Sequence, residues 1–318
     1  MNRATSATGW VRNPVMKSPE LDPTQASSYE LGWTFNPITG CLNHVDGLCE
    51  GGGFPCYAYK LANTRLKQRY LANTNTAYMS KFPDIGYSKL INPFYPRFWE
   101  ERLSEPIENP TPMNPAKRKG IFTCDMSDLF GIGIPESWTE QVMTTIKLCP
   151  YHRFYLPTKQ PQNLIKFSPF PDNCLVGVTA TKTIQYTEAA YWLKEIEAKV
   201  KFISFEPLLE RIAPKAWPWQ LFPEGNPKGI CDWLIIGACT GTLEDTRTAK
   251  HYHQDLTPKF WGRKWTLQPR IEWLQEIVEA ADKAGVKVFL KDNLMPLFKA
   301  EGITSREDWT GIRQEMPA

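Results

Sequence analysis

The sequence lacks any run of about eighteen apolar residues, so it predicts no membrane-spanning helix. The polar segment Met1 to Glu20 also lacks the apolar core of a signal peptide. We therefore expect a cytoplasmic protein with no membrane partner. In that reducing compartment, the eight cysteines are better interpreted as metal ligands or buried thiols than as disulfides.

The net charge is low, +3 over 318 residues, but it is unevenly distributed. Between Lys60 and Lys119, eleven Lys and Arg side chains stand against five Asp and Glu. A basic sector of this kind suits phosphate groups, although a solvated helical face explains the same pattern. Together with twelve Trp and twelve Tyr, it favours a nucleoside-like or nucleic-acid partner, because aromatic rings stack on bases.

Short apolar runs of β-type residues alternate with segments of helical periodicity, which predicts an α/β fold with parallel strands. The number of units fits a barrel or partial barrel better than a short open sheet, without excluding the sheet. The predicted strands are Gly32–Ile38, Gly120–Cys124, Arg153–Pro157, Cys174–Thr179, Val200–Phe205, Trp233–Gly237 and Val286–Lys291. The predicted helices are Tyr57–Tyr70, Pro135–Leu148, Ile184–Lys199 and Pro269–Ala284.

We expect a single barrel domain over residues 31–318, preceded by an extension over residues 1–30 that wraps it. Two irregular insertions interrupt the predicted domain. One is rich in proline, at about residues 92–115, and the other is rich in tryptophan and proline, at about residues 217–227.

The predicted strands end in polar residues. In barrel enzymes the carboxyl ends of the strands form the active-site face, so a shared site is expected there. Polar residues also simply mark where strands stop, which explains any one of them alone. The residues at these strand ends include Asn36, Asp125, Ser127, Asp128, Lys159, Thr179, Thr181, Glu206 and Thr240.

Three cysteines, Cys41, Cys49 and Cys56, fall within sixteen residues just beyond the first predicted strand. Three thiolates hold three irons of a [4Fe–4S] cluster and leave the fourth iron open to a ligand such as S-adenosylmethionine (SAM). With His44, the same cysteines also make a tetrahedral zinc set. Spacing alone does not choose between them, so a zinc-stabilised nucleic-acid-binding protein without radical chemistry remains an alternative.

Several blocks of sequence surround these cysteines and strand ends: Asn36–Cys41, Cys56–Ala58, Phe98–Pro106, Met126–Phe130, Leu156–Pro161, Leu175–Thr179, Phe202–Leu208, Trp233–Gly237 and Ala284–Lys291. They resemble a phage-associated family of radical-SAM-like proteins with a three-cysteine motif. That family is similar in plan to spore photoproduct lyase, with a partial (βα)6 barrel of the TIM type. The chain departs from the family pattern in the six residues between Cys49 and Cys56, where the family generally has two.

The resemblance implies a radical SAM enzyme of lyase or transferase type. A [4Fe–4S] cluster on Cys41, Cys49 and Cys56 binds SAM and, with a one-electron reductant such as flavodoxin or ferredoxin, cleaves it reductively. The resulting 5′-deoxyadenosyl radical abstracts hydrogen from the substrate.

Individual roles are assigned from this plan. Ser127 and Asp128 are candidates for the SAM ammonium group or, alternatively, for a helix N-cap. Lys159 is a candidate for the SAM carboxylate, or an ordinary surface lysine. Thr179 and Thr181 are placed near the ribose.

Glu206 is expected to point into the barrel, where it binds ribose or substrate, or forms an ion pair with Lys159 or Lys291. Tyr57 is expected to stack near the adenine or to shield the cluster. Cys124 and Cys239, at or beyond strand ends, are candidate hydrogen-atom donors to a radical.

Overall fold

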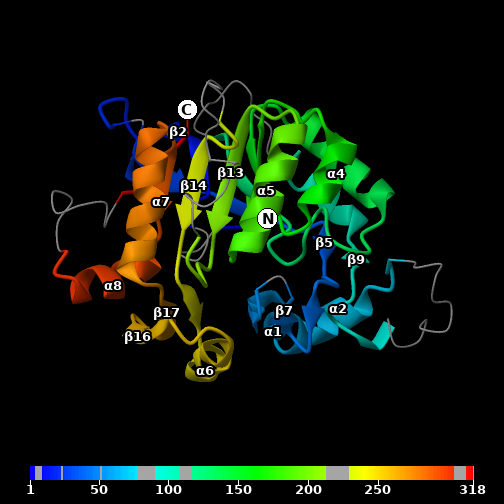
Figure 1. The fold of residues 1–318 in the computed structure, drawn as a ribbon. Helices are drawn as coiled ribbons and strands as arrows, with labels where there is room; N and C mark the ends of the chain where they lie inside the picture. The colour runs from blue at the N-terminus through cyan, green and yellow to red at the C-terminus, as the bar shows by residue number, and fades with distance from the viewer. Residues whose placement is uncertain are drawn as a thin grey trace.

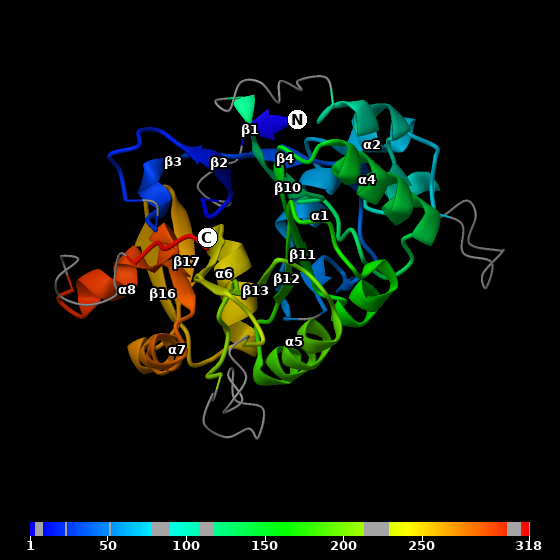
Figure 2. The same ribbon diagram turned by 90° about the horizontal axis from the view of Figure 1, so that it is seen from above.

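The computed structural model describes residues 1–3, 9–22, 24–50, 52–77, 90–107, 117–212, 229–303 and 313–317. Its main sheet contains β1 (Asn2–Arg3), β4 (Trp33–Phe35), β10 (Gly120–Thr123), β11 (Arg153–Thr158), β12 (Cys174–Thr179), β13 (Val200–Phe205), β14 (Trp233–Ile236) and β18 (Lys287–Leu290). They follow one another in that order across the sheet; β13 and β14 lie side by side in Figure 1, and the strands from β1 to β13 can be followed in Figure 2. From β4 to β18 every neighbouring pair is parallel, and β1 joins the edge antiparallel to β4.

The predicted alternation of strands and helices is confirmed, and each predicted strand overlaps one strand of the parallel sheet. The helices are α1 (Tyr57–Asn63), α2 (Lys67–Ala72), α4 (Glu136–Leu148), α5 (Thr183–Glu195), α6 (Leu243–Tyr252), α7 (Ile271–Lys283) and α8 (Met295–Ala300). The single helix predicted over Tyr57–Tyr70 is wrong, because the first helix ends at Asn63 and a second helix begins only at Lys67. Between them, the hydroxyl of Thr64 donates to the carbonyl of Lys60 at 2.6 Å, a local bond that competes with helix continuation.

One face of the sheet packs against α4, α5 and α7, which lie along its outer side in Figure 2. Alternate residues of each strand supply this core, as the two-residue period of a strand requires. On β11, for example, Phe154 and Leu156 join the buried helix residues Val142, Leu193 and Ile277. The buried side of α7 agrees with the spacing of its apolar residues in the sequence.

The opposite face of the sheet encloses a second core, and Trp10 from the N-terminal segment lies in it. Tyr155, Phe202 and Trp233 point inward from β11, β13 and β14 and contact the indole ring. Met316 near the C-terminus joins the same cluster. The first residues of the chain thus fill the inner side of the sheet as well as adding β1 to its edge.

Smaller sheets surround the carboxyl ends of the strands: β5 (Ile38–Thr39) with β9 (Arg97–Phe98), then β6 (His44–Val45), β7 (Leu48–Cys49) and β8 (Phe54–Pro55), and finally β15 (Cys239–Gly241), β17 (Lys264–Gln268) and β16 (Thr257–Trp261). A further pair, β2 (Arg12–Met16) and β3 (Tyr29–Leu31), lies in the N-terminal segment.

The described part of the proline-rich insertion, up to residue 107, is ordered around Arg97. This side chain is fully buried, and its guanidinium donates to the carbonyls of Asn73, Leu90 and Asn92. The insertion predicted at about residues 217–227 lies outside the described residues. Within the described ranges, every helix is too short or too polar to cross a bilayer.

Candidate metal and cofactor site

The first cysteine is fixed to the carboxyl end of the parallel sheet. After β4 the chain passes through β5 to Gly40, whose N–H donates to the Met126 carbonyl at 2.9 Å. The hydroxyl of Ser127 donates to the Gly40 carbonyl in return. Gly40 has a φ of +84°, and a Cβ there would come within 2.6 Å of backbone atoms, so only glycine fits. Cys41 follows directly and is therefore held beside the end of β10.

The other two cysteines belong to the small sheet β6–β7–β8. Cys49 ends β7, and Cys56 is the N-cap of α1, where its N–H donates to the Gly47 carbonyl at 2.8 Å. Gly52 and Gly53 both donate their N–H groups to the Cys49 carbonyl, at 3.0 and 2.6 Å. Gly52 and Gly53 thus belong to the turn that joins β7 to β8, and this hairpin leads the chain from Cys49 back to Cys56.

The three thiols form one electrostatic group with Lys159. All three cysteines are free. Burial is the main cause that raises the pKa of Cys41, to about 12, with Asp128, Cys56 and Cys49 adding to the effect. Burial opposes the charge on Lys159, but the negative groups at Cys49, Asp128, Cys56 and Cys41 outweigh it and raise the lysine pKa. Cys41, Cys49 and Cys56 are therefore all close enough to Lys159 to affect its pKa.

Three thiols are donors of the kind that a [4Fe–4S] cluster takes. In a cluster each thiolate binds a different iron, so the sulfurs need not converge on one point. Among the residues the structure describes, no three His, Cys, Asp or Glu side chains surround a common centre as ligands of one ion. The ring of His44 instead packs against Tyr59 and Phe94, with centroids 4.9 and 5.3 Å away. Its Nδ1 accepts the N–H of Gly47 at 3.4 Å.

Asp128 lies beside the cysteines but is used by the chain itself. Its carboxylate accepts the hydroxyl of Thr158 at 2.7 Å and the backbone N–H groups of Lys159 at 2.8 Å and Phe130 at 3.1 Å. Burial raises its pKa, against these three hydrogen bonds. No helix begins at Ser127 or Asp128, and both instead tie β10 to its neighbours, Ser127 through Gly40 and Asp128 through β11.

The two predicted threonines lie at the carboxyl end of β12, and Thr181 also lies next to the cysteine loop. Thr179 is the last residue of β12 and is buried. The hydroxyl and N–H of Thr181 donate to the side-chain oxygen of Gln185 at 2.8 and 2.7 Å. A Cβ on Gly52 would come within 2.8 Å of the Thr181 hydroxyl oxygen. The absence of a side chain at Gly52 therefore lets the cysteine hairpin approach the end of β12.

Glu206 forms an ion pair with Lys291 rather than with Lys159. The Lys291 side chain is 5% exposed and the Glu206 side chain 24% exposed, so Glu206 is the more accessible partner. Burial lowers the pKa of Lys291 to about 7, an effect that the nearby carboxylate of Asp292 opposes. The indole N–H of Trp10 donates to the other oxygen of Glu206 at 3.1 Å. Glu206, Lys291 and the indole N–H of Trp10 thus form a polar cluster next to the inner core.

Three further predicted residues occupy distinct surroundings. The ring of Tyr57 is 56% exposed, while its hydroxyl donates to the Asp125 carbonyl. Cys124 is buried at the end of β10 with a φ of +62°, and burial raises its pKa. Cys239 lies on β15, paired with Leu267, and burial raises its pKa to about 12. Both thiols are thus protonated in the structure at neutral pH.

Sequence reasoning missed three contacts of this region. The Asn36 side chain joins Asp125 to the backbone N–H of Met126, and both residues were visible only as polar strand ends. The contact of Trp10 could not be predicted, because no sequence pattern in the N-terminal segment indicates which side of the sheet this residue packs against. His253, whose Nε2 lies 2.8 Å from the Gly52 carbonyl oxygen, is separated from it by 201 residues.

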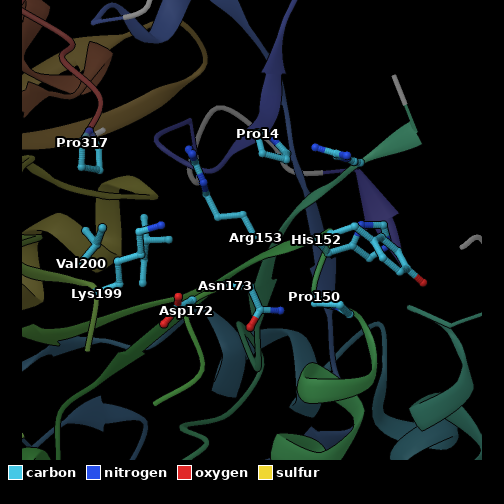
Figure 3. A pocket seen from close by; sticks show the side chains of 12 residues that line it. Pro14, Pro150, His152, Arg153, Asp172, Asn173, Lys199, Val200 and Pro317 are labelled. Atoms are coloured by element: carbon cyan, nitrogen blue, oxygen red, sulfur yellow. The ribbon is translucent and has the colours of Figure 1, made fainter. Parts of the chain in front are cut away.

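A hollow of about 220 Å³ lies at the opposite, amino ends of β11, β12 and β13 (Figure 3). Arg118, Arg153 and Lys199 line it with one carboxylate, Asp172. None of the predicted site residues lines this hollow, so it is separate from the cysteine site.

A family model described as "Protein of unknown function (DUF5131)" matches residues 29–257. No curated protein matches the chain in sequence. Spore photoproduct lyase complexed with dinucleoside spore photoproduct has a TM-score of 0.45 and 13% identity, over 87% of this chain and 81% of that one. A substituted form of that lyase with bound AdoMet and the dinucleoside has a TM-score of 0.42 and 12% identity, over 87% and 80%. These likenesses are too remote to carry a functional argument.

Proposed function

The chain belongs to the DUF5131 family of proteins of unknown function, and we propose that it is a radical SAM enzyme. One observation supports the proposal: Lys159, just after β11, interacts electrostatically with Cys41, Cys49 and Cys56, which follow the carboxyl end of β4 in the same parallel sheet. A sheet with helices on its outer face and polar groups at successive strand ends is the arrangement expected of a partial barrel. When bound there, a reduced [4Fe–4S] cluster supplies the electron that cleaves SAM to a 5′-deoxyadenosyl radical.

The chain's own residues hold and shield this site. We assign the three cysteines as the cluster ligands and the Lys159 ammonium as the group that binds the SAM carboxylate. Ser127 and Asp128 serve chiefly to fix β10 and β11 around it, because their polar atoms already bond to the chain. Glu206, partly exposed above Trp10, is the group that we assign to a ribose or substrate hydroxyl.

A basic and aromatic hairpin favours nucleic acid over a free nucleoside as the substrate. β16 and β17 are joined at the end of the molecule that also carries α1 and α6 (Figure 1). Lys259, Phe260, Arg263 and Lys264 are exposed on it, and Phe260 is 61% exposed although its ring contacts Trp265. Exposed cations bind phosphates and exposed rings stack on bases, and both together characterise single-strand binding surfaces.

Anaerobic reconstitution tests the cluster. We expect about four irons per chain and formation of 5′-deoxyadenosine from SAM after dithionite reduction. Cys56→Ala should lose both, whereas Cys149→Ala, which removes a buried thiol after α4, should keep them. Stoichiometric zinc, with no SAM cleavage, would overturn the radical assignment in favour of the zinc-stabilised binding protein.

Salt-dependent binding of a single-stranded oligonucleotide tests the substrate class. Each lost phosphate contact lowers the slope of log affinity against log salt by about 0.7. Substituting Lys259 and Arg263 together by Gln should therefore lower the slope by up to about 1.4. The matched control, Lys283→Gln with Lys299→Gln on α7 and α8, should leave it unchanged. Binding without any salt dependence would point to a free nucleoside instead.

A further inference from the structure

The glycine hairpin between Cys49 and Cys56 is attached to a helix that comes some two hundred residues later. The Nε2 atom of His253 lies 2.8 Å from the Gly52 carbonyl oxygen, and this contact is buried. His253 directly follows α6 and is 8% exposed. Helix α6 also packs along β8, the strand that leads from the glycines to Cys56.

Because a carbonyl oxygen only accepts, Nε2 of His253 must carry the hydrogen. Burial lowers the pKa of this imidazole, so the ring is neutral and the proton is fixed on Nε2 by the Gly52 carbonyl. A buried donor and acceptor that lost this contact would each go unpaired, which is costly.

A second contact holds the other side of Cys56. Lys60, on the first turn of α1 after Cys56, forms an ion pair with Asp245 at 3.0 Å. Asp245 is fixed in turn by the capping box at the start of α6, where its carboxylate accepts the N–H and hydroxyl of Thr242. The two ends of α6 therefore hold the chain before and after the third cysteine.

The glycines make this attachment possible. Gly53 has a φ of +68°, a conformation that side chains disfavour. A Cβ on Gly52 would come within 2.5 Å of the Phe54 ring and 2.8 Å of the Thr181 hydroxyl. The hairpin is thus held between the end of β12 on one side and His253 on the other.

We propose that His253 is a positioning residue that holds the cysteine hairpin, and with it Cys49 and Cys56, through the Gly52 carbonyl. As a role at the cluster it rests on the proposed function, but the contact itself exists in the chain without a cluster.

Two substitutions of similar size separate this hydrogen bond from simple packing. The amide nitrogen of His253→Gln stands where Nε2 stands, so it still reaches Gly52. The shorter side chain of His253→Asn does not reach. His251→Ala, which removes an exposed histidine two residues earlier on the same helix, is the matched control.

The first readout is the alkylation rate of Cys49 in the metal-free protein, measured by mass spectrometry. Cys49 is buried, so it reacts when the hairpin opens. We expect about a tenfold faster reaction in His253→Asn, because losing one buried hydrogen bond shifts the equilibrium between the closed and open hairpin by about that factor. The rates of His253→Gln and His251→Ala should stay near that of the parent. Equal rates in the Asn and Gln variants would overturn the proposal.

The second readout is the half-life of the reconstituted cluster's visible absorbance under a chelator. It should shorten in His253→Asn and not in His253→Gln. If the parent protein binds no iron, the proposed function fails while the alkylation rates still decide the role of His253. If iron binds and both half-lives are equal, His253 does not position the ligands.

Discussion

Replacing Trp10 by Ala removes the residue through which the N-terminal segment enters the inner core. The indole is 3% exposed. Its ring centroid lies 5.4 Å from Phe122, 5.7 Å from Tyr155, 5.6 Å from Phe202 and 6.0 Å from Trp233. These neighbours belong to strands of the main sheet, so they can close only a small part of the resulting cavity.

The size of the effect follows from the buried area. A buried aromatic side chain covers about 150–250 Å², which corresponds to about 4–6 kcal/mol at about 25 cal/mol per Å². Measured losses for such truncations are about 3–5 kcal/mol, so we expect the free energy of unfolding to fall by that amount. Trp10→Phe keeps most of the ring and loses mainly the hydrogen bond to Glu206, at about 1–2 kcal/mol.

Urea denaturation followed by far-ultraviolet circular dichroism measures both variants, and an unchanged slope with denaturant would show that the folded state is the same. If the N-terminal segment were dispensable for folding, Trp10→Ala would lower the free energy of unfolding only slightly. A loss below about 1 kcal/mol for Trp10→Ala would therefore refute the view that the sheet needs residues 1–30 to complete its inner core.

Three further predictions concern stability and the site. Glu206→Gln should cost about 2–4 kcal/mol in urea denaturation, because it removes the ion pair between Glu206 and the buried side chain of Lys291, and Lys291→Met added to it should recover part of that loss. Burial first, and then Lys119, lowers the pKa of His152 to about 4 from 6.5, so the unfolded chain binds a proton more readily. The stability that His152 contributes is complete above pH 6.5 and is lost as the pH falls toward 4, by up to about 3 kcal/mol, and His152→Gln should lack this part of the pH profile. Gly52→Ala should lower the iron content of the reconstituted protein, because the new methyl group meets the Thr181 hydroxyl at 2.8 Å; unchanged iron would show that the hairpin shifts freely.

Much of the scaffold was predictable from local pattern. The apolar runs of β12 and β13 are buried on both faces, as expected of parallel strands covered by helices. The apolar spacing of α7 predicted its buried side. The helix beginning at Tyr57 was too long in the prediction, because the hydrogen bond from Thr64 to Lys60 acts against propensity at one position.

The candidate site was predictable as a set of residues, but its contacts were not. The sequence placed three cysteines beyond the first strand and polar groups after the others, and the sheet brings several of them together. It left open whether Glu206 pairs with Lys159 or Lys291, and the structure pairs it with Lys291. The domain boundary near residue 30, the three cysteine ligands and the roles of all the other predicted site residues stay predictions.

The sequence by itself determined the alternation of strands and helices, the chemistry of the three thiols and the presence of glycines between them, because these depend on neighbours along the chain. Only the tertiary structure decided that Trp10 fills the inner core and donates to Glu206, and that His253 holds Gly52. These pairs are separated by 196 and 201 residues. No periodicity or motif encodes which distant partner satisfies a buried donor; the packing of the whole sheet selects it.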